Sequence, residues 1–238
     1  MPRTLADLDR QLEELAGEFT AVDTVNVPDL TRFDVRSWDA CLQVRQSLPN
    51  AIPHLRAIDV NPEAEWALPA QLAQGGITEV IVVTGDAPVD LGSPVYPCDS
   101  VQLIRRLKRA MPGLKVYAAL DPYRSGMREE LDYAQEKLEA GASGFFTQPF
   151  FDLRMLDVWA EQLPDVPVFW GVTSVTAERS WLYWRNRNRA VFPGGFAPTL
   201  AWNREFAALV LEWARANDQS LYFMPIRSSL KSWLAGIL

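Results

Sequence analysis

The chain has few residues of the kinds that form covalent or metal cross-links. Its 238 residues include two cysteines, Cys41 and Cys98, and a single histidine, His54. The cysteines stand alone in unrelated contexts, without the spacing of a zinc site or a disulfide framework. The sequence therefore predicts no metal site. Unpaired thiols are typical of a reducing compartment, so we expect the protein to be cytoplasmic.

Long apolar runs and an excess of positive charge are also missing. No stretch is long and apolar enough to cross a membrane, and the start, MPRTLADLDR, has no apolar signal segment. The formal net charge of -7 disfavours nucleic-acid binding through overall charge. The local basic stretch WRNRNR, beginning at Trp184, comes with no recognised nucleic-acid-binding fold. We therefore expect neither a membrane nor a nucleic acid as a partner.

The chain does have a regular alternation of apolar, strand-like runs and amphipathic, helix-like runs. The predicted strands are residues 22–27, 52–58, 79–86, 115–120, 144–149, 166–172 and 220–226. The predicted helices are residues 5–19, 37–48, 62–76 with an interruption at Pro69, 100–111, 129–141, 155–163, a segment from Glu178, and 203–217. No linker or internal repeat interrupts the series, so we expect one domain over residues 1–238.

Nearly all the strands lack polar alternation, which is typical of parallel strands buried on both faces of an α/β fold. An open doubly wound sheet and a closed barrel both fit this pattern. There is no G-x-G-x-x-G turn to support a Rossmann dinucleotide site. The sequence therefore favours a TIM (βα)8-type barrel.

In either architecture, functional residues lie at the carboxyl ends of the strands. The polar and turn residues at these ends are Asn26, Pro28, Asp29, His54, Asp59, Thr84, Gly85, Asp86, Asp121, Thr147, Gln148, Asp152, Thr173, Ser174, Arg227 and Ser228. Gln148 is the most informative, because it ends the apolar strand in GFFTQPFFD. Its amide offers both donors and an acceptor to a polar heterocycle.

Several motifs together resemble those of the methylenetetrahydrofolate reductases. They are IPHLRAID, ITEVIVVTGDAP, YPCDSVQLI, EKLEAGASGFFTQPFFD and LYFMPIRSSLKSWLAGIL, in the family's order and roughly at its spacing. DTVNVPD and DSVQLI are similar to a reductase-like branch found beside corrinoid and one-carbon enzymes. The resemblance covers essentially the whole chain. It implies a (βα)8 barrel that binds FAD, with NADH or NADPH as the reductant and a folate as the substrate.

The resemblance also assigns residues to roles. Asp86 matches an aspartate that stabilises a cationic iminium form of the substrate, Gln148 a pterin-binding glutamine, and Trp184 an aromatic residue stacked on the substrate. The cofactor-contacting positions fall on His54, Thr84, Arg124, Glu130 and Lys137.

Some family residues differ in this chain. Thr84 replaces an arginine, Leu120 a tyrosine, Arg124 a histidine and Ser180 a folate-contacting glutamine. The first strand of the family, with its general-acid glutamate, has no counterpart before MPRTLADL. We therefore expect a barrel that lacks or substitutes its first strand. Unpaired strand edges and nine tryptophans lead us to expect self-association as well.

These residues also have simpler interpretations. His54 can be a packed residue, Glu130 and Lys137 can face solvent on a charged helix, and the tryptophans near Trp184 can simply pack. The leading hypothesis is an oxidoreductase that converts 5,10-methylenetetrahydrofolate to 5-methyltetrahydrofolate, with hydride from a flavin or directly from a nicotinamide. The alternative is a non-catalytic folate- or flavin-binding paralogue, or a subunit that depends on a partner.

Overall fold

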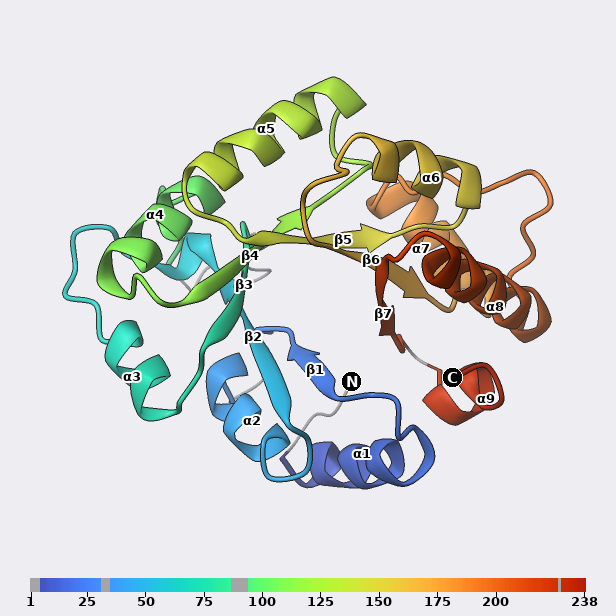
Figure 1. Cartoon of the computed structure of the whole chain (residues 1–238), viewed down its shortest axis with the longest axis horizontal. Coiled ribbons are helices and arrows are strands. Elements are labelled where there is room, and N and C mark those ends of the chain that lie inside the picture. Colours follow the sequence, from blue (N-terminus) through green and yellow to red (C-terminus); the bar gives the residue numbers. More distant parts are fainter. Residues whose placement is uncertain (1–4, 31–34, 87–93, 227) are drawn as a thin grey trace. The chain divides into compact units, whose positions relative to one another are not determined.

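The computed structural model describes residues 5–30, 35–86, 94–226 and 228–238. Helices and strands alternate along these ranges (Figure 1). The strands are β1 (Thr24–Val27), β2 (Asn50–Arg56), β3 (Glu79–Val83), β4 (Lys115–Leu120), β5 (Gly144–Pro149), β6 (Val168–Thr173) and β7 (Ser220–Met224). The helices are α1 (Leu5–Glu18), α2 (Ser37–Val44), α3 (Leu68–Gln74), α4 (Ser100–Ala110), α5 (Met127–Glu139), α6 (Leu153–Glu161), α7 (Glu178–Arg187), α8 (Leu200–Ala216) and α9 (Leu230–Leu234), with a 3-10 turn, η1 (Ala57–Asp59).

The chain divides into two compact units. The N-terminal unit contains Pro2–Ala119 and Gln135–Gly144, and the C-terminal unit contains Leu120–Ala134 and Phe145–Leu238. The helix α5 contributes residues to both units. A single domain over the whole chain stays a prediction.

The N-terminal unit is built on parallel strands that follow one another in chain order. β1 pairs with β2, β2 with β3 and β3 with β4. The middle of β3 is fully buried, with Val80, Ile81 and Val82 at 0%, 1% and 0% exposure. Strands buried in this way need cover on both faces, and α2 and α4 pack against β2 and β3.

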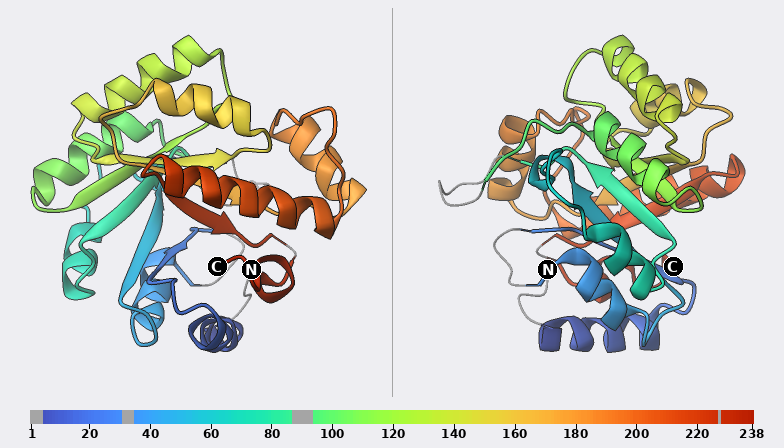
Figure 2. Two further views of the ribbon diagram at one scale, coloured as in Figure 1. Left: turned by 45° about the vertical axis from the view of Figure 1, so that its right-hand side comes forward. Right: turned by 90° about the vertical axis from the view of Figure 1, so that its left-hand side faces the viewer.

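The C-terminal unit has the same plan, with β5, β6 and β7 parallel and in chain order. The helix α8 lies alongside β7 (Figure 2). Trp170 of β6 is fully buried and packs edge-to-face against Phe150 and Trp213. Most of the nine tryptophans belong to this unit, namely Trp159, Trp170, Trp181, Trp184, Trp202, Trp213 and Trp233. Its core is therefore largely aromatic.

Local sequence signals explain where two of the helices begin. Asp99 is the N-cap of α4, and it forms a capping box with Gln102. The expected interruption of a longer helix at Pro69 is wrong. The helix α3 begins at Leu68 with Pro69 in its first turn, where a missing backbone N–H is tolerated.

The strand order agrees with the predicted fold class. In a doubly wound sheet the order of strands reverses part-way, whereas in a barrel each strand lies beside the next one in the chain. Both units follow the second rule. The chain therefore has an α/β fold of the TIM-barrel type, with seven strands among the described residues instead of eight. No helix in the described ranges is long and apolar enough to span a membrane.

Candidate functional site

The ends of β2 and β3 are tied together in the N-terminal unit. The Ile58 backbone N–H donates to the carbonyl oxygen of Thr84 at 3.1 Å. Nη2 of Arg56 donates to the carbonyl oxygen of Asp86 at 2.7 Å. Gly85 has a φ of 93°, and a Cβ there would lie 3.0 Å from the Ile58 side chain and 3.2 Å from that of Arg56. Only glycine fits this turn without strain, so residues 84–86 are fixed against the end of β2.

The Asp86 side chain is exposed just beyond the end of β3. Within the described part of its unit no cation pairs with this carboxylate, although the backbone of Asp86 is held by Arg56. Such a carboxylate can approach a positively charged ligand group without first losing a protein partner. Thr84, also exposed, has its Oγ1 3.2 Å from Ser100 Oγ. Its hydroxyl therefore already has a hydrogen-bond partner.

His54 is half-buried in β2, and its Nε2 lies 3.2 Å from Oδ1 of Asn26 in β1. Two residues predicted at the site from different strands are thus in contact. Burial lowers the pKa of His54 to about 4, so the imidazole is neutral near pH 7. The backbone carbonyl of His54 accepts a 2.6 Å hydrogen bond from Ser37 Oγ, which joins β2 to the start of α2. These contacts agree with the packed interpretation of His54, and its contact with a cofactor stays a prediction.

A cluster of alternating charges lies at the ends of β1 and β2. Arg36 pairs with the buried Asp29 and lies 3.4 Å from Asp59, and Nε of Arg56 is 3.1 Å from the same Asp59 carboxylate. Burial raises the pKa of Asp29, and the neighbouring Arg36 opposes that shift. Sequence analysis missed both arginines. The available signal was Arg56 itself, a charge inside an apolar strand with an acidic residue three positions later.

Gln148 lies in an irregular part of β5 in the C-terminal unit. The register between β5 and β6 shifts between Phe146 and Pro149, as it does at a β-bulge. Oγ1 of Thr147 accepts the backbone N–H of Gly171 at 2.9 Å. Gln148 is half-buried, and its amide makes no hydrogen bond within the described part of its own unit. The bulge therefore leaves an amide available beside a strand end, and contact of Gln148 with a ligand stays a prediction.

The backbone at this bulge is supported from β7. The Tyr222 hydroxyl donates to the carbonyl oxygen of Thr147 across β6. Gly171 of β6 leaves space for this hydrogen bond. A Cβ there would lie 2.8 Å from the Thr147 carbonyl oxygen and 3.1 Å from the Tyr222 ring. Burial raises the pKa of Tyr222 well above its usual value, so the hydroxyl keeps its proton.

Glu130 and Lys137 on α5 are 1% and 2% exposed, so the simpler interpretation that they face solvent is wrong, and their contact with a cofactor stays a prediction. Oε1 of Glu130 accepts the backbone N–H of Asp121 at 3.1 Å, and its other oxygen pairs with Arg124. Nζ of Lys137 donates to the carbonyl oxygen of Ala119 at 2.7 Å. Both charged groups are engaged with the end of β4 and the turn that follows it.

These contacts test whether the residues assigned to a flavin fit one. The resemblance assigns Glu130 and Lys137 to the cofactor, but both side chains are buried and bonded to the protein. The Arg124 guanidinium lies 4.4 Å from the centre of the Tyr133 ring as well as against Glu130. A flavin would have to break these interactions in order to reach the three side chains. As packed, they do not fit FAD, and we assign no step to it.

Trp184 belongs to an aromatic cluster of the C-terminal unit. It is 6% exposed and packs edge-to-face on Phe151, with ring centroids 5.8 Å apart. Phe151 also stacks on Phe192 at 4.3 Å. The burial of Trp184 agrees with the packing interpretation, and stacking on a substrate stays a prediction.

Other residues at strand ends have structural contacts. Asp152 is the N-cap of α6, and Arg154 lowers its pKa. Oγ1 of Thr173 donates to the carbonyl oxygen of Met224 at 2.8 Å. Arg227 lies outside the described residues. Across the described ranges, no group of three or more His, Cys, Asp or Glu side chains could hold a metal ion.

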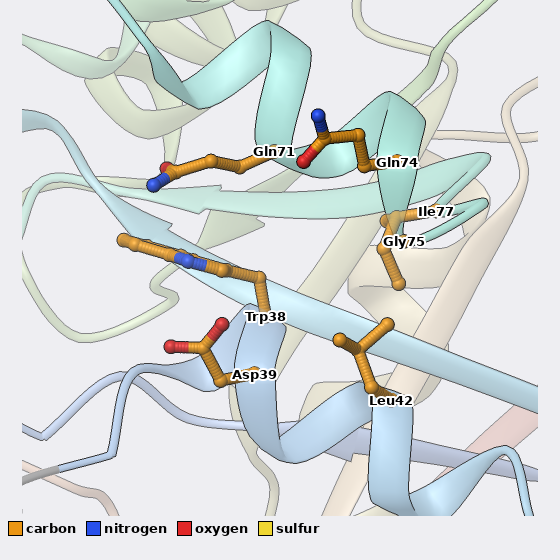
Figure 3. Close-up of a pocket in the computed structure, with 7 residues that line it drawn as sticks. All are labelled: Trp38, Asp39, Leu42, Gln71, Gln74, Gly75 and Ile77. Carbon is orange, nitrogen blue, oxygen red and sulfur yellow. The ribbon is translucent and has the colours of Figure 1, made fainter.

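A pocket of about 410 Å³ lies between α2 and α3 (Figure 3). It is lined by Trp38, Asp39, Leu42, Gln71, Gln74, Gly75 and Ile77. These residues belong to covering helices and to the turn after α3, and none was predicted as a site residue. The pocket is therefore separate from the strand-end residues described above.

Comparison with known proteins identifies the family. The family model for methylenetetrahydrofolate reductase matches residues 5–193. The chain belongs to the methylenetetrahydrofolate reductase family. It is 28% identical to the 5,10-methylenetetrahydrofolate reductase of Escherichia coli over 131 residues, which cover 53% of this chain and 44% of that enzyme. It is also 28% identical to the enzyme of Pectobacterium carotovorum over 181 residues, or 74% of this chain and 60% of that enzyme.

Among solved structures, the chain is similar to an uncharacterized protein from Clostridium thermocellum that binds two copies of 5-methyl-5,6,7,8-tetrahydrofolic acid. The TM-score is 0.65 at 11% sequence identity, over 98% of this chain and 87% of that one. This likeness supports the fold. The predicted family is confirmed. The matches to the two curated reductases span about half of their lengths, so their activity is not transferred by similarity alone.

Proposed function

We propose that the protein binds a reduced folate and reduces 5,10-methylenetetrahydrofolate to 5-methyltetrahydrofolate, with NADH or NADPH as the reductant. The observation that carries this proposal is the family match over residues 5–193. The folate bound by the similar Clostridium thermocellum protein supports the choice of ligand. Two strand-end groups supply suitable chemistry, the Gln148 amide and the Asp86 carboxylate.

The proposed roles follow from what each group can do. The Gln148 amide would orient the pterin, because it can donate and accept hydrogen bonds along the edge of a heterocycle. Opening the five-membered ring of the substrate transfers a proton to N10 and leaves a cationic iminium at N5. The Asp86 carboxylate would stabilise that cation. Water would supply the proton to N10 during ring opening. Hydride from the nicotinamide would then add to the methylene carbon and give the methyl group.

Asp86 and Gln148 belong to different units, and each is proposed to contribute to folate binding. A cytoplasmic location and self-association also stay predictions.

A second candidate is a folate-binding protein without reductase activity, or a subunit that needs a partner for catalysis. This second candidate is favoured by the contacts that three side chains make within the protein, namely Glu130, Lys137 and Arg124. A chain that cannot place a flavin would keep its folate site and lose the family's usual hydride carrier.

Two measurements on the purified protein separate these candidates. Calorimetry with 5-methyltetrahydrofolate tests folate binding, and incubation with 5,10-methylenetetrahydrofolate and NADH or NADPH tests for 5-methyltetrahydrofolate as the product. The reductase proposal expects binding and product formation. Binding without product supports the second candidate, whereas absence of binding contradicts both. The visible spectrum supplies an independent check, because a bound flavin would make the protein yellow.

A further inference from the structure

We propose that Arg56 is a positioning residue that sets the Asp86 turn for ligand binding, and that Asp59 holds Arg56 in place for this role. The ligand part of this inference rests on the proposed folate site. The clamp itself rests only on contacts within the N-terminal unit.

Arg56 can act as a clamp because one guanidinium reaches two different segments. It is the last residue of β2 and is 9% exposed. Its Nη2 donates to the carbonyl oxygen of Asp86 at 2.7 Å, while Nε lies 3.1 Å from Oδ2 of Asp59. The second contact is an ion pair without an aligned hydrogen bond from Nε. A planar guanidinium can make both contacts at once, and the single ammonium of lysine cannot reproduce this geometry.

Asp59 is in turn fixed from the other side. It ends η1, the turn directly after β2, and its carboxylate lies 3.4 Å from Nη2 of Arg36. Arg36 lies at the start of α2 and pairs with Asp29. Asp29 also accepts the Ser37 backbone N–H at 3.3 Å. The two arginines and two aspartates balance in charge. Arg56 therefore has a counterion inside the protein and does not need a ligand anion to neutralise it.

The clamp acts on the backbone and leaves the functional group accessible. The turn is held by Ile58 N–H at Thr84, by close packing at Gly85 and by Arg56 at Asp86. The Asp86 side chain remains exposed. Arg56 thereby reduces the freedom of the main chain that carries the carboxylate, which lowers the entropy lost when a ligand binds.

The test compares two arginines that bind backbone carbonyls in the same unit. Arg56→Lys is the test variant. The matched control is Arg106→Lys, because Arg106 donates to the carbonyl oxygens of Asn61 at 2.7 Å and Ala64 at 3.0 Å, away from the Asp86 turn. We expect Arg56→Lys to raise the dissociation constant for 5-methyltetrahydrofolate by about tenfold, and Arg106→Lys to change it by less than about twofold. Asp59→Asn should weaken binding in the same direction as Arg56→Lys.

Two further readouts distinguish positioning from direct ligand contact. Hydrogen exchange of the ligand-free protein should show faster exchange at the Ile58 amide in Arg56→Lys, because the turn that accepts its hydrogen bond is loosened. In an Asp86→Ala background, Arg56→Lys should have no further effect on folate affinity. Unchanged exchange, or an equal loss of affinity with and without Asp86, would overturn the proposal. If the parent protein binds no folate, the proposed function fails and the exchange measurement alone decides whether the clamp exists.

Discussion

The Tyr222 hydroxyl donates to the carbonyl oxygen of Thr147 across an intervening strand. Tyr222→Phe removes this donor and leaves a carbonyl at the β5 bulge without it. We expect the free energy of unfolding to fall by about 1–2 kcal/mol in a denaturant titration. Tyr183→Phe is the control, because Tyr183 is 58% exposed and should change stability by less than about 0.5 kcal/mol. Equal effects of the two variants would contradict a specific role for the Tyr222 hydroxyl.

Gly171 should tolerate no side chain. A Cβ there would lie 2.8 Å from the Thr147 carbonyl oxygen, so Gly171→Ala must displace either the β5 backbone or the Tyr222 ring. We expect a loss of roughly 1–3 kcal/mol, measured by thermal or chemical unfolding. At Gly113, where no atom lies within 4 Å of the added Cβ, the same substitution should be close to neutral. An unchanged melting temperature for Gly171→Ala would refute this packing argument.

Lys137 should contribute to folding and not to ligand binding. Lys137→Met keeps most of the buried stem but removes the donor to Ala119, so we expect a loss of about 1–3 kcal/mol in unfolding free energy and an unchanged folate affinity. The control on the same helix is Arg128→Met, because the Arg128 side chain is 88% exposed. A stable Lys137→Met protein that has lost a ligand would instead place Lys137 in a cofactor site.

Asp86 and Gln148 should behave in the opposite way. Asp86 is exposed, Gln148 is half-buried, and neither side chain makes a hydrogen bond or ion pair with the described residues of its own unit. Asp86→Ala and Gln148→Ala should therefore change stability by only about 0.5 kcal/mol. Loss of a hydrogen bond or charge contact to folate should weaken binding by about 1–3 kcal/mol, measured by calorimetry. Variants that melt far below the parent with unchanged affinity would show that both residues are structural.

His54 should make the protein sensitive to mild acid. Its pKa is lowered to about 4 by burial, whereas an unfolded histidine titrates near 6.5. The unfolded chain therefore binds a proton first, and the stability that is fully present above pH 6.5 is lost as the pH falls toward 4. Between about pH 7.5 and pH 5 we expect the parent to lose about 1–2 kcal/mol more unfolding free energy than His54→Gln. Identical pH profiles of the two proteins would contradict this assignment.

The strands could be predicted from sequence because burial on both faces leaves a continuous apolar run. The predictions for 115–120 and 144–149 match β4 and β5 at every residue. Helix α9 was missed, since five residues carry too little periodicity to be recognised. The helix expected over 62–76 was too long, because helix-forming residues before Leu68 concealed its true start.

The site was harder to predict than the fold. Asp86 and Gln148 could be named as candidates, because a polar residue after an apolar strand is a local signal. The burial of Glu130 and Lys137 depends on carbonyl and N–H groups at the end of β4, which the composition of α5 does not reveal. The clamp formed by Arg56 joins residues 30 positions apart, and such a contact follows only from the pairing of β2 with β3.

The uneven distribution of tryptophan has a practical consequence for spectroscopy. Only Trp38 and Trp66 belong to the N-terminal unit, so intrinsic fluorescence reports mainly on the C-terminal unit. Far-ultraviolet circular dichroism reports on the helices of both units. If the units unfold separately, the two signals will give different midpoints, and fluorescence alone would miss damage to the Arg56 clamp.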